Sequence, residues 1–175
     1  VDEVLGSDGM HLGVVVKVLQ NLLIEGVSIK DMLTIFESLA DSCKKTQNPE
    51  VLMSQVRRNL GRTIVRKYES SPGNIQVVSL DRSIEDLLVS GVKHHEDGSS
   101  SLNVEPDIAQ KLLNSIAEKV GVFNKSGAVP VLLCGSRIRY DLRKIVSRFI
   151  PGLAVISFDE IPAEYQTESL GIVTI

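Results

Sequence analysis

LGVVVKVLQNLLIEGVSIKDMLTIFESLAD, residues 12–41, contains two apolar runs at helical spacing with a glycine between them. Gly26 is expected to end the first helix, because glycine accepts the left-handed conformation common at helix C-termini. Ser28 is the predicted N-cap of the second helix, with Asp31 in its first turn, where negative charge suits the helix dipole. The stretch therefore predicts two amphipathic helices joined by a short turn.

Each of these helices has an apolar face that we expect to be buried. In the first helix this face is formed by Leu12, Val15, Leu19, Leu22 and Leu23. In the second it is formed by Ile29, Met32, Leu33, Phe36, Leu39 and Ala40. The polar residues of the second helix are left on the other side: Lys30, Asp31, Thr34, Glu37 and Asp41.

A third helix is predicted from Pro49 to about Tyr68. Asn48 suits its N-cap, and proline suits the first helical position, where its missing N–H leaves nothing unpaired. An apolar line at steps of four is expected to close a three-helix cluster: Leu52, Val56, Leu60 and Ile64. A second line at the same step is basic and consists of Arg58, Arg62 and Arg66.

The pattern changes after SSPGN, residues 70–74, which we interpret as a linker. Strand-like runs follow at residues 75–80, 101–104, 129–134 and 153–157, and helical patterns at 83–89, 137–149 and from Pro106. Residues 129–157 give strand, helix and strand within about 30 residues, the length of one βαβ unit with parallel strands. The final SLGIVTI is expected to form an edge strand or a tail.

These patterns predict an α+β protein whose second half resembles an α/β fold. We expect a flexible lead-in at residues 1–11 and a helical subdomain at 12–69. After the linker at 70–74, a small α/β subdomain with a βαβ unit is expected at 75–175.

Composition limits the function classes. The net charge of −3 gives no general attraction to nucleic acid or to anionic lipid. Cys43 and Cys134 match no metal or redox spacing, so we expect two reduced thiols. No apolar run approaches the ~20 residues of a membrane span. Because the chain begins with valine, we expect it to be a fragment.

One alternative from a different class is a hydrolase that acts through Cys134. CGSRIR, at residues 134–139, follows a predicted strand and precedes a helix, where anions often bind. It is similar to the cysteine phosphatase loop, but that loop needs five residues between Cys and Arg, whereas here Arg139 comes one residue early. We interpret Cys134 as packing at a strand end, with an incidental anion near Ser136 and Arg137 as the open alternative.

Two other clusters of potential ligands have simpler interpretations. His94, His95 and Glu96 are adjacent, and neighbouring side chains seldom converge on one metal ion without a distant partner, so we predict a solvated loop. DEIP, at residues 159–162, is interpreted as a surface loop that meets a partner, because no nucleophile or glycine-rich phosphate loop accompanies its carboxylates. We therefore expect no catalytic residues, no cofactor and no metal.

The helical hairpin also resembles a DNA-binding helix-turn-helix, the second alternative from another class. Its second helix would place Asp31, Glu37 and Asp41 beside phosphates with only Lys30 to offset them, which is the wrong charge for a DNA contact. We therefore expect a structural hairpin and no nucleic-acid partner.

Three stretches resemble one known family. KVLQNLLIEGVSIKDMLTIFESLAD, PVLLCGSRIRYDLRKIVSRFIPGLAVISFDEIP and SLGIV are similar to the soluble C-terminal domain of the FlhA export-gate family. The resemblance covers residues 14–173, is weakest between Tyr68 and Asn103, and is closer to the flagellar members than to those of virulence type III secretion.

The resemblance implies a part of a type III protein export gate, with no enzymatic activity. Family members form a nine-membered ring on the cytoplasmic side of the bacterial inner membrane. They dock export chaperone–cargo complexes, work with an export ATPase complex, and are anchored by an N-terminal membrane region that is absent from this sequence. The implied function is flagellar protein export, with virulence secretion as the alternative.

A ring of this kind suggests a use for the charged residues of the helical subdomain. A head-to-tail ring needs two different, complementary patches on each subunit. We predict a subunit interface between a basic and an acidic set of side chains: Arg58, Arg62 and Arg66 with Asp31, Glu37 and Asp41.

Overall fold

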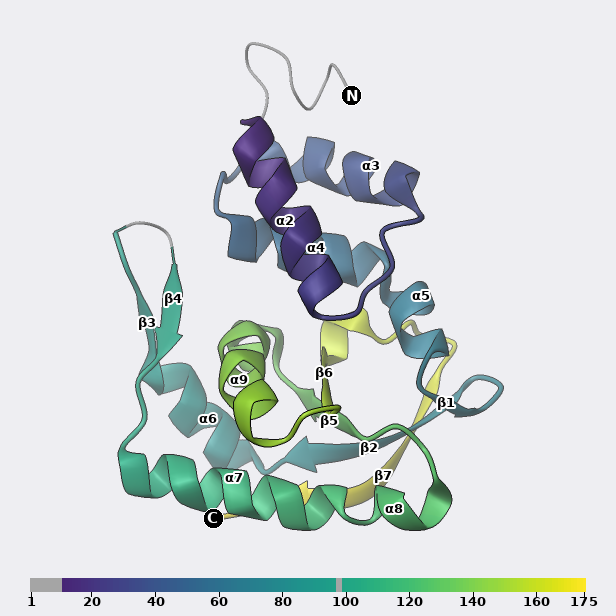
Figure 1. Cartoon of the computed structure of the whole chain (residues 1–175), viewed down its shortest axis with the longest axis vertical. Helices are drawn as coiled ribbons and strands as arrows, with labels where there is room; N and C mark the ends of the chain where they lie inside the picture. Colours follow the sequence, from purple (N-terminus) through teal and green to yellow (C-terminus); the bar gives the residue numbers. More distant parts are fainter. Residues whose placement is uncertain (1–10, 97–98) are drawn as a thin grey trace. The chain divides into compact units, whose positions relative to one another are not determined.

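The computed structural model describes residues 11–96 and 99–175, and the predicted flexible lead-in lies outside the described residues except for His11. The chain divides into two compact units between Ile64 and Val65 (Figure 1). We call them the helical unit and the sheet unit. The division falls inside a short helix rather than at residues 70–74, where the linker was predicted.

The helical unit contains α2 (Leu12–Ile24), α3 (Met32–Cys43), α4 (Pro49–Asn59) and the start of α5 (Gly61–Arg66). α4 packs against both α2 and α3. Gly26 has a φ of 69° just after α2, as predicted for a glycine that ends a helix. Asn48 caps α4 as predicted, because its side chain accepts the backbone N–H of Glu50 at 2.9 Å.

Two predictions for the hairpin are wrong. α3 begins at Met32, and its N-cap is Asp31 rather than Ser28, because the Asp31 carboxylate accepts the Thr34 N–H at 3.1 Å. The helices are also rotated from the prediction. Leu33 is 71% exposed and Phe36 is half-buried, whereas Ile35, absent from the predicted face, is fully buried.

The same rotation applies to α2. Its buried residues are Val15, Val18 and Leu22, while Leu12 and Leu23 are exposed. The predicted apolar line of α4, from Leu52 to Ile64, is confirmed as buried, although the helix is interrupted after Asn59 and resumes at Gly61. A glycine inside a helix costs about 1 kcal/mol relative to alanine, which favours a break at this point.

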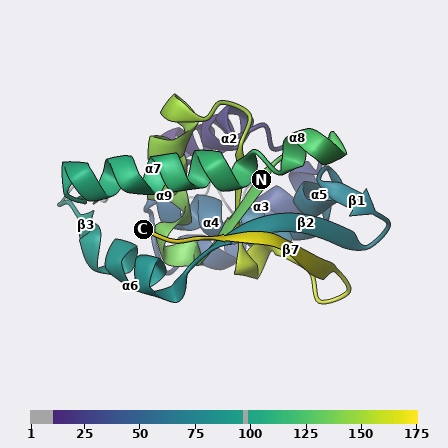
Figure 2. The same cartoon turned by 90° about the horizontal axis from the view of Figure 1, so that it is seen from below.

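The sheet unit is built on β2 (Asn74–Leu80), β5 (Val131–Cys134), β6 (Ala154–Ser157) and β7 (Gln166–Val173). β2 pairs in parallel with β5 and β7, and β5 pairs in parallel with β6. Figure 2 shows β2 and β7 side by side. The final SLGIVTI was expected to form either an edge strand or a tail. β7 shows that most of it belongs to an edge strand.

Helices connect these strands. α6 (Arg82–Gly91) follows β2, α7 (Pro106–Val120) and α8 (Phe123–Ser126) precede β5, and α9 (Ser136–Phe149) joins β5 to β6. The predicted βαβ unit is thus confirmed. Apolar side chains of the strands and of these helices form one core cluster, which includes Val78, Leu88, Ile116, Leu132 and Val146.

The predicted linker is part of a β-hairpin. β1 (Glu69–Ser71) pairs with β2 in antiparallel fashion, and Gly73, with a φ of 74°, lies in the turn between them. A second pair of strands, β3 (Val92–His94) and β4 (Ser100–Leu102), is antiparallel, and it includes His94, which was predicted to lie in a solvated loop.

The connection from β6 to β7 has no α-helix. It spans residues 158–165 and contains only the 3-10 helix η1 (Phe158–Glu160). Parallel strands usually need a crossover of about a dozen residues or more, most often a helix. This connection is shorter, and side-chain hydrogen bonds of Glu160 and Tyr165 hold its two ends.

Candidate functional site

The acidic residues predicted for an interface all lie exposed at or on α3. Asp31 is the N-cap, and its second carboxylate oxygen accepts the Thr34 hydroxyl at 2.8 Å. Glu37 and Asp41 are four residues apart and share one side of the helix. α3 thus presents one acidic pair to solvent and one carboxylate that is already used for capping.

The basic residues of the predicted interface are also exposed, but they do not form one continuous helical line. Arg58 lies in the last turn of α4, where positive charge suits the helix dipole. Arg62 and Arg66 lie one turn apart on α5. Arg66 falls on the far side of the division at Ile64, so only Arg58 and Arg62 belong to the helical unit.

A buried ion pair in the helical unit was missed by sequence reasoning. Arg57 Nη1 lies 2.9 Å from Glu25 Oε2, with the two side chains 3% and 9% exposed. It connects the C-cap residue of α2 to α4. The sequence position of Arg57 could have revealed this pair. Arg57 follows Met53 by four residues and therefore lies on the same, buried face of α4, where an arginine needs a carboxylate partner.

A second buried contact joins α3 to α4. The Asn59 side-chain amide donates to the Ser38 hydroxyl at 2.8 Å, and Ser38 is buried. A serine on the inner face of α3 interrupts its apolar periodicity. This interruption explains why the sequence pattern favoured the wrong rotation.

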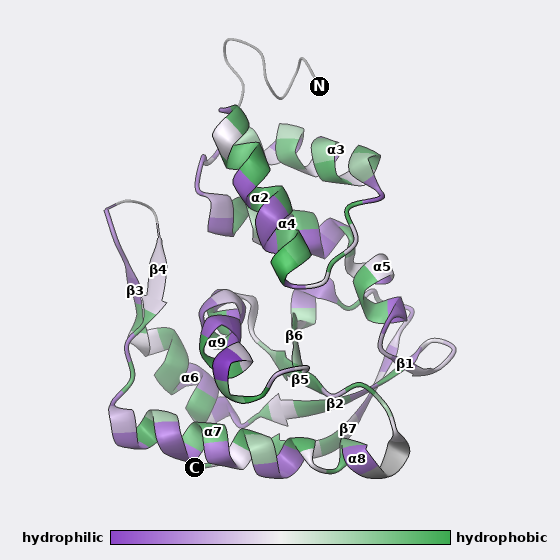
Figure 3. Ribbon diagram, viewed as in Figure 1, coloured by the Kyte–Doolittle hydropathy of each residue, from purple (hydrophilic) through white to green (hydrophobic). Residues whose placement is uncertain are grey.

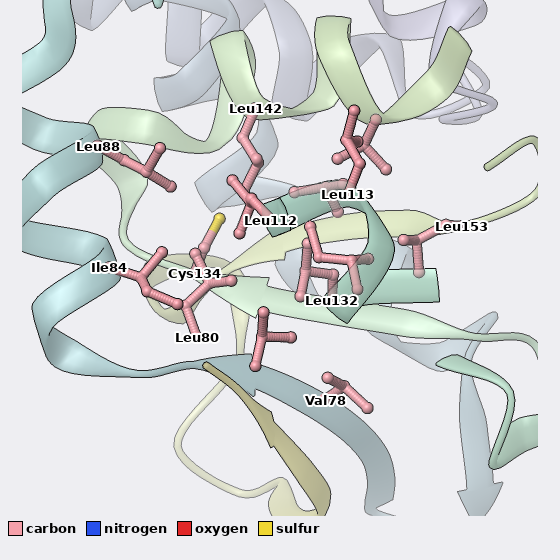
Figure 4. Packing of buried hydrophobic residues seen from close by; sticks show 14 of the residues in the cluster. Val78, Leu80, Ile84, Leu88, Leu112, Leu113, Leu132, Cys134, Leu142 and Leu153 are labelled. Carbon is pink, nitrogen blue, oxygen red and sulfur yellow. The ribbon is translucent and has the colours of Figure 1, made fainter. Parts of the chain in front are cut away.

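Cys134 lies inside the core of the sheet unit. It has no exposed surface and is surrounded by apolar side chains, among them Leu80, Ile84 and Leu112 (Figure 4). Its thiol lies 3.9 Å from the Ile156 carbonyl oxygen. A substrate cannot reach a sulfur in this position, so the geometry does not support the hydrolase alternative.

The turn after Cys134 already holds a carboxylate. Glu85, from α6, accepts the backbone N–H of Gly135 at 2.8 Å, at the N-terminus of α9. α9 has no acidic residue in its own first turn, so Glu85 supplies the negative charge that suits this helix end. The sequence suggested an incidental anion near Ser136 and Arg137. In the structure the Glu85 carboxylate, from the same chain, lies at this end of α9.

Two of the motifs singled out in the sequence meet in the structure. Arg139, from CGSRIR, lies 3.4 Å from Glu160, from DEIP, measured from Nε to Oε1, and both side chains are buried. The Ser157 hydroxyl also donates to Glu160 Oε1 at 3.2 Å. The prediction of DEIP as a surface loop is therefore wrong at Glu160, whose carboxylate is buried, although Asp159 is exposed.

Asp141 connects α9 to the β3–β4 hairpin. Its buried carboxylate accepts the Ser100 hydroxyl at 2.6 Å and lies 3.3 Å from Lys144 Nζ. Lys144 also donates to the Ser100 carbonyl oxygen at 3.1 Å and lies over the Tyr140 ring. These contacts hold β4 against the helix.

The histidines of the hairpin do not form a metal site. His94, His95 and Glu96 are exposed, and His95 Nε2 lies 2.8 Å from the Ser101 hydroxyl. Across residues 11–96 and 99–175, no three His, Cys, Asp or Glu side chains lie close enough to hold an ion.

Hydrogen bonds shift the pKa of two surface groups. The hydroxyl and the backbone N–H of Ser83 donate to Asp81 and hold the pKa of this carboxyl below its usual value. The Tyr165 hydroxyl donates to Glu69 Oε1 at 2.5 Å, and this bond raises the pKa of Tyr165. The second bond also fixes the end of the β6–β7 connection to β1.

The clusters therefore differ in what they can do. In the sheet unit, Glu85, Arg139, Asp141 and Glu160 make contacts that join its own elements. The helical unit carries exposed charges and exposed apolar residues on α2 and α3. Among the described residues, no helix has the length and the apolar character that crossing a bilayer requires.

Comparison with known proteins identifies the family. The model of the FHIPEP family matches residues 1–166. The chain belongs to the FHIPEP family. Within this family, the flagellar biosynthesis protein FlhA of Bacillus subtilis is 31% identical over 166 residues, which cover 95% of this chain and 24% of FlhA.

Solved structures agree with the FHIPEP assignment. The solved structure of the CdsV protein of Chlamydia pneumoniae superimposes with a TM-score of 0.86 at 30% identity, over 94% of this chain and 47% of that chain. The nonameric SctV-C of EPEC gives a TM-score of 0.84 at 28% identity, over 94% of this chain and 49% of that chain. The predicted fold class and the resemblance to the FlhA export-gate family are confirmed, and the chain spans about half of each solved domain.

Proposed function

We propose that this chain is part of the cytoplasmic domain of a type III protein export gate that forms a ring on the cytoplasmic side of the bacterial inner membrane. One observation carries the proposal: almost the whole chain superimposes on a subunit of the nonameric SctV-C. Flagellar export is favoured over virulence secretion, with support from the identity to Bacillus subtilis FlhA.

The partners follow from the same proposal. The chain contacts further copies of itself, most simply in a nonamer, and helps to dock export chaperone–cargo complexes near an export ATPase complex. A membrane region N-terminal to the chain anchors it, and neither nucleic acid nor a cofactor takes part. The acidic side of α3 supports this exclusion of nucleic acid, because it would repel phosphates.

Part of the ring contact lies between the basic and the acidic side chains predicted from the sequence. Arg58 and Arg62, with Arg66 at the other end of α5, face Glu37 and Asp41 of a neighbouring copy, while Asp31 contributes from the α3 cap. Exposed ion pairs of this kind contribute at most about 1 kcal/mol each. Their main effect is to fix register and orientation, which a closed ring requires.

The test uses the chain with an N-terminal histidine tag, bound to vesicles that carry nickel-chelating lipids. Binding to a surface concentrates the chain and strengthens weak lateral contacts. Chemical cross-linking should give a ladder of oligomers, and electron microscopy of the vesicle surface should show closed rings. A chain that remains monomeric at high surface density would contradict the proposed function.

Charge reversal tests the proposed contact. Arg62→Glu should reduce the cross-linked ladder, because the new carboxylate would repel the acidic side chains of the neighbouring copy. The melting temperature of the variant is measured as well, to separate a lost contact from a loss of folding. Glu37→Lys or Asp41→Lys in the same chain should restore part of the ladder. Lys45→Glu makes the same charge change in an exposed loop and serves as the control. An unchanged ladder with Arg62→Glu would remove the arginines from the interface.

A further inference from the structure

β7 is the longest strand of the sheet, and one of its two edges is unpaired. It has eight residues and pairs with β2, and in the described part of the chain it has no other strand partner (Figure 2). The sheet ends on the opposite side at β6, which has four residues, the last three of them buried. The outer edge of β7 is therefore the long open edge of the sheet unit.

Hydrogen bonds at the two ends of β7 show which of its backbone groups face outward. The Gln166 N–H donates to the Gly73 carbonyl at 2.9 Å, and the Val173 carbonyl accepts the Asp81 N–H at 2.9 Å. Alternate residues of a strand direct their backbone groups to the same neighbour, so every second residue of an edge strand faces away from it. Counted from the two ends up to the bulge, the outward-facing residues are Thr167, Ser169 and Ile172.

The open edge has few of the features that protect exposed strands. Natural edge strands are guarded by lysine, proline, inward-pointing charges or bulges. Residues 166–173 contain neither lysine nor proline, and their one charged side chain, Glu168, accepts the Gln76 side-chain amide of β2 at 2.9 Å. The bulge at Leu170 is the one protective feature of the strand. The edge therefore keeps the capacity to accept a further strand.

The side chains of β7 indicate the chemistry of the strand that it would accept. Figure 3 shows β7 as hydrophilic in its first half and hydrophobic in its second. Residues 164–175 contain two exposed carboxylates, those of Glu164 and Glu168, and neither lysine nor arginine. Ile172, in the second half, is 52% exposed. A segment with a basic residue beside Glu168 and an apolar residue beside Ile172 would complement this edge.

We propose that the open edge of β7 binds an extended, unfolded segment of a cargo protein, which pairs with it as an additional β-strand. The inference rests on the proposed function as an export gate and names the form in which the cargo is bound. In this mode of recognition the main-chain hydrogen bonds give the affinity, and the side chains add a preference. Main-chain recognition tolerates many sequences, as a gate that handles different cargo proteins requires.

An unfolded segment suits this edge better than a folded partner. A folded protein must present an open strand of its own, and such strands are protected in most proteins. An unfolded chain can instead offer any stretch of its main chain, although it loses conformational entropy when that stretch is ordered. Because only three residues of β7 face outward, the contact is short, so the bound segment can be released again.

Amide hydrogen exchange with a model peptide tests the proposal. The probe is a short synthetic peptide that alternates threonine and valine and carries a lysine at each end. We expect it to slow the exchange of the outward N–H groups of Thr167, Ser169 and Ile172. Exchange at Gln166, whose N–H is already bonded to Gly73, should not change. Equal exchange at the three outward positions with and without the peptide would overturn the proposal.

A proline at an outward position provides a matched pair of variants. Thr167→Pro removes an N–H that points away from β2, so the pairing with β2 and the urea unfolding midpoint should change little. Thr167→Ala removes the same side chain but keeps the N–H. Thr167→Pro should weaken peptide binding about tenfold or more, because the main chain supplies most of the affinity, and Thr167→Ala should change it less than about twofold. Equal affinities of the two variants would contradict strand pairing.

Charge reversal of the probe tests the predicted preference. A peptide with glutamate in place of both lysines should bind more weakly, because it meets the carboxylates of Glu164 and Glu168. Glu168→Gln should reduce the difference between the two peptides. A stronger binding of the glutamate peptide would overturn the predicted chemistry of the cargo segment.

Other occupants of the edge give different results in the same exchange experiment. Protection of the three N–H groups that increases with the concentration of the chain, without peptide, would assign the edge to a second copy. Protection in the complete cytoplasmic domain, without peptide, would assign it to the remaining half of that domain. Either result would overturn the proposal.

The peptide experiment and the vesicle experiment fail independently. If rings form on vesicles but the peptide protects none of the three N–H groups, this inference is overturned and the proposed function stands. If the peptide protects them but the chain stays monomeric on vesicles, the strand-binding edge is supported and the proposed ring fails.

Discussion

Ile35 is the residue on which the packing of α3 depends most directly. It has no exposed surface, so Ile35→Ala should lower the free energy of unfolding by ~2–5 kcal/mol. Leu33, two positions earlier, is 71% exposed, and Leu33→Ala should change it by less than ~0.5 kcal/mol. Urea unfolding of the two variants measures both values. A larger loss with Leu33→Ala would mean that α3 is rotated from the position described.

The hydroxyl of Ser83 makes the largest contribution to the lowered pKa of Asp81. Ser83→Ala removes the side-chain donor, so the pKa of Asp81 should rise toward its ordinary value of 3.8. Because the folded pKa is lowered, the bond stabilises the protein above the unfolded pKa, and this stability is lost as the pH falls through the folded pKa. NMR titration of Asp81 in both proteins measures the shift. An identical titration curve would assign the lowered pKa to the backbone N–H instead.

Single residues also show where sequence reasoning reached its limit. Asn48, Pro49 and Gly26 were predicted correctly, because capping and helix termination depend on local chemistry. Phe36 was assigned to the wrong side of α3, because the buried face of α3 includes a polar residue, Ser38. The Ser38 hydroxyl accepts a hydrogen bond from the side chain of Asn59 on another helix. A polar residue with a distant partner cannot be recognised from periodicity alone.

Among the helices, α2 and α4 are joined by the Glu25–Arg57 ion pair. Arg57→Ala leaves a carboxylate with 9% exposure beside an apolar core, and it should cost ~3–5 kcal/mol of stability. The double variant Glu25→Gln with Arg57→Ala removes both charges and should cost clearly less than the sum of Glu25→Gln and Arg57→Ala measured alone. Chemical denaturation of the four proteins completes the cycle. Additive effects would show that the two charges do not depend on each other.

The elements of the sheet unit were largely predictable, whereas the contacts between them were not. The apolar runs and the helical pattern predicted a βαβ unit, and the structure has its three elements at Val131–Cys134, Ser136–Phe149 and Ala154–Ser157. The contact between Arg139 and Glu160 was not foreseen, although both motifs had been noted, because pairing depends on where β6 delivers η1. Sequence patterns reveal the period of an element but not its neighbours.

For the molecule as a whole, the division at Ile64 predicts that residues 61–175 fold alone. Their core cluster is internal to the sheet unit, from Val78 to Val173. The fragment should unfold cooperatively in urea. Removing residues 166–175 should abolish that transition, because β7 pairs along the whole of β2 and Val173 is fully buried. Retention of the same midpoint after the deletion would make β7 dispensable for the fold.

The linker predicted at residues 70–74 is instead part of the β1–β2 hairpin. SSPGN combines residues that suit both a linker and a tight turn, and only the pairing of β1 with β2 distinguishes the two. β1 has three residues, too few for an alternating pattern to reveal it. The family resemblance was recognisable from long matching stretches, while the assembly surfaces stay predictions.

The parallel pairing of β2 with β7 has a consequence for synthesis of the chain. Gln76 meets Glu168 across this pair, 92 residues later. At a translation rate of about 5–20 residues per second, β2 leaves the ribosome about 5–20 s before its partner. The helices of the N-terminal unit can pack within that time, whereas the edge of β2 that pairs with β7 stays without its partner strand until the end of synthesis. An unpaired strand edge is a template for pairing with another chain, so this interval is when the chain is most prone to aggregate.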